Sequence, residues 1–122
     1  QPITMQTYGN ANQFYLSANS NVGIGTSSPS EKLSVNGNIK TQKLIVTQTG
    51  WSDYVFDSSY QLKSLPDIER FIRKNKHLPD IPSTKEVEEK GVSVGDNQAL
   101  LLKKIEELTL YIIDQQKQIN EH

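Results

Sequence analysis

Residues 97–122 read NQALLLKKIEELTLYIIDQQKQINEH, and this stretch decides how the rest of the chain must fold. Its apolar residues recur at alternating intervals of four and three positions, which is the heptad spacing of a helix that packs against other helices. Asp96 is of a residue type that caps helix N-termini, so we expect the helix to begin there. The predicted seam, through which several copies of the chain would meet, consists of Leu101, Ile105, Leu108, Ile112, Gln115 and Ile119.

The pattern alone does not fix how many helices meet at this seam. Isoleucine at the a positions with leucine at the d positions favours a dimer. Leu102, Leu110, Tyr111 and Ile113 widen the apolar stripe, which favours a trimer or a helix that also packs on its own domain. Gln115 occupies a d position, where a buried polar side chain lowers stability but can fix register and chain number.

Composition also favours association between copies. The chain has 122 residues, of which only 34% are hydrophobic, and many of these lie in the C-terminal helix. Small chains bury proportionally little surface, so a single copy would have a thin core. Association would supply the missing buried surface.

Charge and composition exclude several classes of partner. The 13 basic and 14 acidic residues give a net charge of −1 and form no block of one sign, so we expect no nucleic-acid partner. No apolar run approaches the roughly 18 residues of a membrane span, so we expect no membrane insertion. The absence of cysteine excludes disulfides and thiolate metal sites.

Residues 1–50 are predicted to form a β-rich segment. Short apolar pairs alternate with turn-forming residues, and Asn36-Gly37 predicts a hairpin. The strands have too few apolar side chains for a monomeric sandwich, so we expect strands from several chains to interleave. A disordered tether is the alternative, because asparagine, serine and glycine are abundant. The predicted strands centre on Phe14 and Leu16, Val22 and Ile24, Leu33 and Val35, Ile39, and Leu44 and Val46.

Residues 51–96 are predicted to form a small mixed domain. Large side chains cluster between Trp51 and Tyr60, where a packed core or an interface should begin. Ser64 is the expected cap of a short helix that runs to about Asn75. Two prolines, Pro79 and Pro82, then require an extended crossing.

A second short helix should follow this crossing. Ser83 and Glu86 have the spacing of a capping box, and Gly91 should end the helix. Val92 and Val94 could form a two-residue strand before the long helix. The predicted fold class is therefore α+β, with a β-rich segment at 1–50, a mixed domain at 51–96 and a coiled-coil helix at 97–122.

No residue pattern predicts a catalytic centre, a metal site or a cofactor. His77 has no second histidine near it, and we expect it to have a structural role. The glutamates of residues 86–89 should form a solvated helix face. Gly23 and Gly25 lack the lysine and the following helix of a phosphate-binding loop.

Two stretches resemble known families. Residues 21–40, NVGIGTSSPSEKLSVNGNIK, resemble the VGIGT-x-x-P-x-x-K-L-x-V-x-G-x-I block of bacterial and phage tail-fibre-like proteins. Residues 50–122, with GWSDYVFD, NKHLPDIPS and VSVGDNQALLLKKIEELTLYII, resemble the C-terminal domain of fibre proteins common in Bacteroidetes. That domain is similar to the intramolecular chaperone domain of phage tail spikes and endosialidases.

The resemblance implies an elongated homotrimer. Its C-terminal helices would trimerise the chains, help a β-rich shaft to fold in register, and cap a fibre. It also implies an extracellular or virion location, as a cell-surface filament or a phage-like particle, with a parent fibre or baseplate as partner.

Members of the chaperone family often cleave themselves at a Ser-Asp pair, using a lysine five residues after the serine as the base. Ser52-Asp53 matches the start of this motif, but Asp57 stands where the lysine is expected. We therefore predict that the chain is not an enzyme and keeps this domain. The alternatives are a tip that binds a cell-surface glycan or protein and, as a more distant one, a self-cleaving protease.

Overall fold

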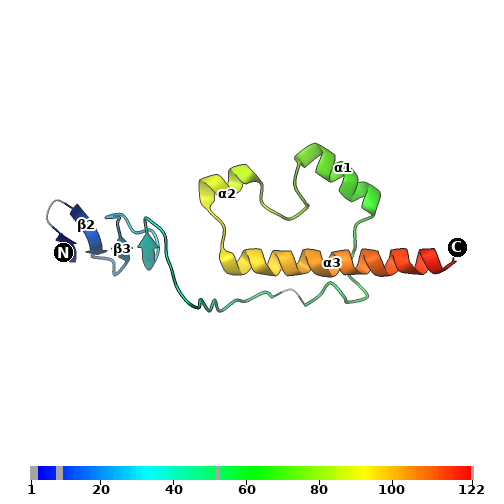
Figure 1. Ribbon diagram of the computed structural model, residues 1–122, viewed down its shortest axis with the longest axis horizontal. Coiled ribbons are helices and arrows are strands. Elements are labelled where there is room, and N and C mark those ends of the chain that lie inside the picture. Colours follow the sequence, from blue (N-terminus) through cyan, green and yellow to red (C-terminus); the bar gives the residue numbers. More distant parts are fainter. Residues whose placement is uncertain (1–2, 8–9, 52, 122) are drawn as a thin grey trace. The chain divides into compact units, whose positions relative to one another are not determined.

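The computed structural model describes residues 3–7, 10–51 and 53–121, in which the chain has the predicted mixed α+β fold (Figure 1). These residues contain four strands and three helices. The chain divides into two compact units, Gln1–Leu44 and Ile45–His122. The first unit contains the strands and the second contains the helices.

The first unit is a four-stranded sheet in the order β1-β2-β3-β4. Its strands are β1 (Ile3–Thr7), β2 (Asn10–Leu16), β3 (Val22–Ile24) and β4 (Leu33–Val35). β2 pairs antiparallel with both β1 and β3, while β3 and β4 are parallel. Three of the predicted strands are confirmed, and they pair within one chain. The sequence pattern did not predict β1.

The hairpin predicted at Asn36-Gly37 is wrong. β4 runs parallel to β3, so residues 25–32 bring the chain back to the end of the sheet where β3 began. The Asn36 amide continues the ladder by donating to the Ile24 carbonyl at 2.8 Å. Gly25, at φ +75°, makes the sharp turn after β3, and a side chain there would lie 3.1 Å from the Asn36 carbonyl oxygen. In the part of the chain that the structure describes, no strand follows Gly37.

The strand predicted at Leu44 and Val46 is also wrong for a single chain. These residues are in the extended stretch after β4, without strand hydrogen bonding among the described residues. The side chains of Leu44 and Ile45 are 69% and 73% exposed. Alternation predicts which side chains share a face, but a strand also needs a neighbouring backbone to pair with.

The two short helices of the second unit form where their caps predict them. α1 (Leu65–Asn75) begins after Ser64, whose hydroxyl accepts a hydrogen bond from the Asp67 amide. α2 (Thr84–Lys90) begins with a complete capping box between Ser83 and Glu86. Gly91, at φ +73°, ends α2. These boundaries are confirmed because a cap acts within a few residues along the chain.

The long helix α3 (Val94–Glu121) begins earlier than predicted. Its N-cap is Ser93, whose Oγ accepts a hydrogen bond from the Asp96 amide at 3.3 Å, so the cap predicted at Asp96 is wrong. Asp96 instead lies in the first turn, where its carboxylate interacts favourably with the helix dipole. Val94 is helical, which also rules out the strand predicted at Val92 and Val94.

Close packing against residues 46–48 explains the glycine at the start of α3. Gly95 is buried, and a side chain there would collide with the side chain of Gln48 and lie 3.0 Å from Val46. The Gln48 amide also donates to the Asp96 carboxylate at 2.5 Å. The extended segment before residue 50 is thus attached to the first turn of α3. From there, residues 45–51 and 53–58 follow the side of α3 opposite α1 and α2 (Figure 1).

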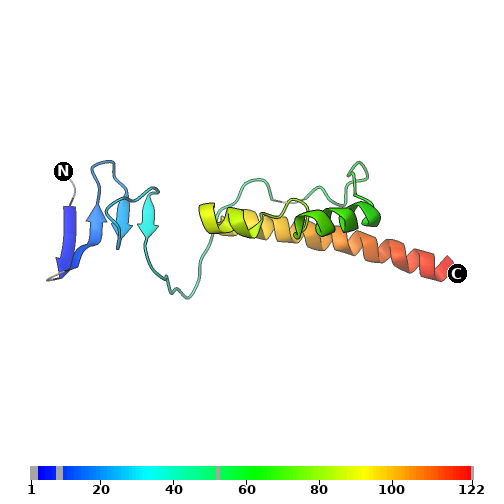
Figure 2. The ribbon, with the colours of Figure 1, turned by 90° about the horizontal axis from the view of Figure 1, so that it is seen from above.

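The second unit has almost no apolar core of its own. Among the described residues, Val55 is the only fully buried apolar side chain, at 1% exposure. α1 and α2 lie along α3 in both views, but no Cα atom of either helix comes within 8 Å of a Cα atom of α3 (Figures 1 and 2). None of the described helices is both long and apolar enough to cross a membrane.

Candidate assembly surface

The six predicted seam residues lie along one side of α3, and none of them is buried. Their apolar side chains range from 48% exposed at Leu101 to 67% exposed at Ile119. Gln115 is exposed as well. The chain therefore presents a long apolar stripe that its own residues do not cover. An amphipathic helix normally packs this stripe against its own domain.

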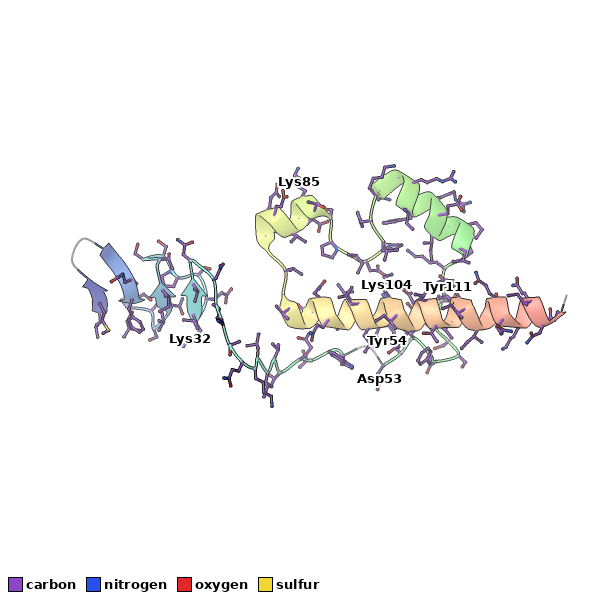
Figure 3. All side chains as sticks on the ribbon, in the orientation of Figure 1. Lys32, Asp53, Tyr54, Lys85, Lys104 and Tyr111 are labelled. Carbon is purple, nitrogen blue, oxygen red and sulfur yellow. The ribbon has the colours of Figure 1, made fainter. Side chains whose placement is uncertain are left out.

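Another side of α3 is covered by the chain itself. Leu102, Leu110 and Tyr111, which lie outside the seam, are only partly exposed. The Tyr111 hydroxyl donates to the Lys63 carbonyl at 2.5 Å, which holds the residues just before α1 against the helix. Lys104 and Tyr111 lie on the side of α3 that faces α1, whereas Tyr54 lies on the opposite side (Figure 3). The helix thus packs on its own domain and still leaves its seam open.

A group of polar side chains attaches two loops to the middle of α3. The Tyr60 hydroxyl donates to Glu107 at 2.6 Å, and Glu107 pairs with Lys104 at 3.0 Å. Asp80 accepts from Lys103 at 3.0 Å and from Lys104 at 3.3 Å. We call these five residues the polar clasp. Its two lysines and two carboxylates balance in charge, so it can be partly buried without an uncompensated charge.

The surroundings of the polar clasp shift the pKa values of its members. Burial, together with the hydrogen bond to Glu107, raises the pKa of Tyr60 far above its ordinary value. The hydrogen bond from Lys103 lowers the pKa of Asp80 below its ordinary value of 3.8, against the smaller effect of burial. Tyr60 is therefore a neutral donor and Asp80 a charged acceptor at neutral pH.

The lowered pKa of Asp80 predicts a loss of stability in acid. An Asp with a lowered folded-state pKa stabilises the fold above its unfolded-state pKa, about 3.9, and this contribution disappears as the pH falls through the folded-state value. We expect Asp80→Asn to unfold at a lower temperature than the parent chain at pH 6, and this difference to shrink at pH 3. Thermal unfolding followed by circular dichroism measures both differences.

Asp114→Asn is the matched control for this comparison. Asp114 is an exposed carboxylate on α3 whose hydrogen-bond partner is Gln118 rather than a lysine. It makes the same change of charge outside the polar clasp. If Asp80→Asn lowered the unfolding temperature equally at both pH values, the charge of Asp80 would not be the cause.

An apolar groove lies between α1 and α3 and shares one wall with the seam. Its volume is about 400 Å³. We call it the α1–α3 groove. Leu101, Ile105 and Leu108 of the seam form the wall on α3. The opposite wall consists of Leu65, Ile68, Leu78 and Pro79.

The edges of the seam contain few charges that could select a partner. The flanking e and g positions include Thr109, Gln116 and Gln118, which are neutral. Lys104 is charged, but it is already paired with Asp80 and Glu107. In coiled coils, charges at e and g set partner choice and orientation. Within this seam, Gln115 is the only polar residue, so it is the best candidate for fixing register.

The residues weighed for chemistry have structural contacts where the structure describes them. Ser52 lies outside the described residues. Asp57 accepts hydrogen bonds from the hydroxyl and the amide of Ser59, which lower its pKa and hold a turn. The His77 ring lies edge-on to Phe71, and its Nδ1 is 2.8 Å from the Leu78 carbonyl oxygen. In the described ranges, no three His, Asp or Glu side chains are grouped to hold a metal ion.

Sequence patterns predicted the seam but missed the polar clasp and the α1–α3 groove. The one signal for the clasp in the sequence was the group of charged residues Lys103, Lys104 and Glu107 in the middle of an otherwise apolar stretch of the helix. No protein-family model, curated protein or solved structure matches this chain. The function proposed below therefore rests on the geometry of the assembly surface.

Proposed function

We propose that this chain is the assembly end of a homotrimeric fibre, in which the α3 helices of three copies join through their seams. The open seam is the observation that carries this proposal. The chain covers another side of the same helix with its own loops, so the seam is not exposed for lack of covering segments. A surface left free in this way is suited to a second and a third copy.

The total surface of the chain supports the same conclusion. One copy exposes 10134 Å². A compact monomer of 13.8 kDa would expose about 6,600 Å², so this chain exposes roughly half as much again. Obligate subunit interfaces bury about 2,000–5,000 Å², which is the scale of this excess. Association would therefore give one copy the core that it lacks.

The distribution of apolar side chains on α3 supports three copies. A two-stranded coiled coil buries a narrow stripe of a and d residues. In this chain the α1–α3 groove continues the seam on one side, and Ile113 adds a 46% exposed apolar side chain on the other. Three copies, in which each helix contacts two neighbours, would bury a wider part of each helix than two copies would.

The mechanism of such an assembly end is kinetic as well as structural. Non-local strands pair slowly, because closing large loops costs entropy before any contact forms. Joining three chains through their helices raises the local concentration of the strand-forming segments. The exposed side chains of residues 39–46 are then available for packing between chains. The assembly end would both start folding in register and cap the finished fibre.

The resemblance to tail-fibre-like proteins supports a place outside the cell or on a virion. In that setting the partners would be two further copies of this chain and the rest of a parent fibre or a baseplate. The absence of cysteine means that stability outside the cell would come from packing between chains rather than from disulfides.

Static light scattering of the 122-residue chain over a series of concentrations tests the proposal. We expect a mass of three chains that persists on dilution, because burial of the seams should give a stable interface. A mass of one chain at all concentrations would refute the assembly role. A stable mass of two chains would keep the seam but refute the trimer.

A binding tip is the second candidate function. Trp51, Tyr54 and Phe56 lie close together in the sequence and are about half exposed or more. Aromatic side chains in this state can bind a glycan or a protein surface, although packing between copies would cover them equally well. A chain that remained monomeric would make this candidate the leading one.

A further inference from the structure

We infer that the α1–α3 groove of one copy receives the edge of α3 from the next copy, so that α1 clamps its neighbour's helix. This inference rests on the proposed homotrimer and names the contact that would complete it. The occupant is a second copy of this chain, and the contacting residues are Thr109 and Ile113.

The α1–α3 groove lies directly beside the seam and shares residues with it. The groove contains Leu101, Ile105 and Leu108, which are seam residues, and also Lys104 and Tyr111. Lys104 and Tyr111 occupy g positions of the heptad, so the groove opens on the g edge of the seam. Any helix that packs on the seam from this edge must also meet the opposite wall of the groove.

The symmetry of a trimer determines which edge of the neighbouring helix faces the groove. A closed trimer has a threefold axis, so its three helices run parallel. In a parallel coiled coil, the g edge of one helix faces the e edge of the next. The neighbour's e edge therefore lies opposite the groove. At the level of Tyr111, this edge presents Thr109 and the adjacent b residue Ile113.

The exposed residues on the two surfaces are complementary. Ile113 is 46% exposed and lies outside the seam, where a bare three-helix coiled coil would leave it in water. Leu65 of α1 is 44% exposed and, like Ile68, lines the groove. No Cα atom of α1 lies within 8 Å of one of α3 in a single copy, so α1 stands away from its own α3. The neighbour's helix edge would fill this space.

The level of α1 along the helix is fixed by hydrogen bonding. The Tyr111 hydroxyl bonds to the Lys63 carbonyl at 2.5 Å, two residues before α1 begins. This contact places the start of α1 at the level of Tyr111, which lies between Thr109 and Ile113 along α3. Asp80, bonded to Lys103 and Lys104, holds the far end of the groove wall.

Cysteine cross-linking tests the inference, because the chain contains no cysteine of its own. One population carries Ile68→Cys and a second, longer tagged population carries Thr109→Cys. The two are unfolded, mixed and refolded together, and then treated with a short bis-maleimide. We expect a covalent pair that contains one chain of each length, visible on a denaturing gel.

Asp114→Cys is the matched control in place of Thr109→Cys. It is an exposed residue little more than one turn away, at a c position on the opposite edge of the helix. We expect it to give at least tenfold less mixed product. Equal yields from both positions, or a larger yield from residue 114, would overturn the clamp.

Light scattering on the same mixtures separates the two proposals. If the mass is that of three chains and residues 68 and 109 do not cross-link, the clamp is wrong and the homotrimer stands. If the mass is that of one chain, the homotrimer itself fails and the clamp fails with it. Titration of free thiols before cross-linking confirms that both cysteines are reactive.

Discussion

The Ile105→Asp, Ile112→Asp double variant is expected to behave as a single chain in solution, whereas we expect the parent chain to have the mass of three chains. Both residues occupy a positions of the seam and are more than half exposed in one copy. In the assembled state their replacements would place carboxylates between helices without partners. Burying an unpaired charge costs about 3–5 kcal/mol, so association should weaken by more than about a hundredfold.

Light scattering and sedimentation at matched concentrations measure this effect. The control is Lys117→Asp with Asn120→Asp, two exposed positions farther along α3 that lie outside the seam. This control adds the same two residues to the same helix and should keep the mass of three chains. A double seam variant that remained trimeric and soluble would show that the chains do not meet at this surface.

The Val55→Asp variant is expected to unfold the loop that covers α3. Val55 is the one fully buried apolar side chain among the described residues, at 1% exposure. The same loop carries Tyr60, which bonds to Glu107 of the polar clasp. An unpaired carboxylate at this site should lower the free energy of unfolding by about 3 kcal/mol or more.

Thermal unfolding and limited proteolysis measure this loss. For a unit of this size, about 3 kcal/mol corresponds to a fall in Tm of roughly 10 °C or more. We also expect new proteolytic cleavage within residues 53–63. Ser58→Asp is the control, because Ser58 is exposed in the same loop. If both variants had the Tm of the parent chain, Val55 would not be the centre of this packing.

The two variants test the seam of α3 and the attachment of the covering loop to α3 separately. Loss of the seam should separate the chains but leave the loop attached through the polar clasp. Loss of Val55 should free the loop, and the seam itself would remain unchanged. Different outcomes for the two would show that assembly and the internal packing of the second unit rest on separate residues.

The sequence alone determined those features that depend on near neighbours along the chain. The caps Ser64 and Ser83 set α1 and α2, because a serine hydroxyl reaches an amide only three residues away. The α3 seam was predictable because the period of a helix brings residues three and four apart onto one face. Three strands could be located as well, because alternate residues of a strand share a face and their apolar side chains therefore recur at every second position.

The tertiary structure decided everything that depends on which distant segments meet. Ser93 rather than Asp96 caps α3, since both are acceptable capping residues and packing of residues 46–48 against Gly95 extends the helix to Val94. β4 pairs in parallel, although its own residues read like one arm of a hairpin. The clasp and groove join α3 to loops between 20 and 50 residues earlier in the chain. Periodicity specifies a face but not what covers it, because covering depends on contacts between segments far apart in the sequence.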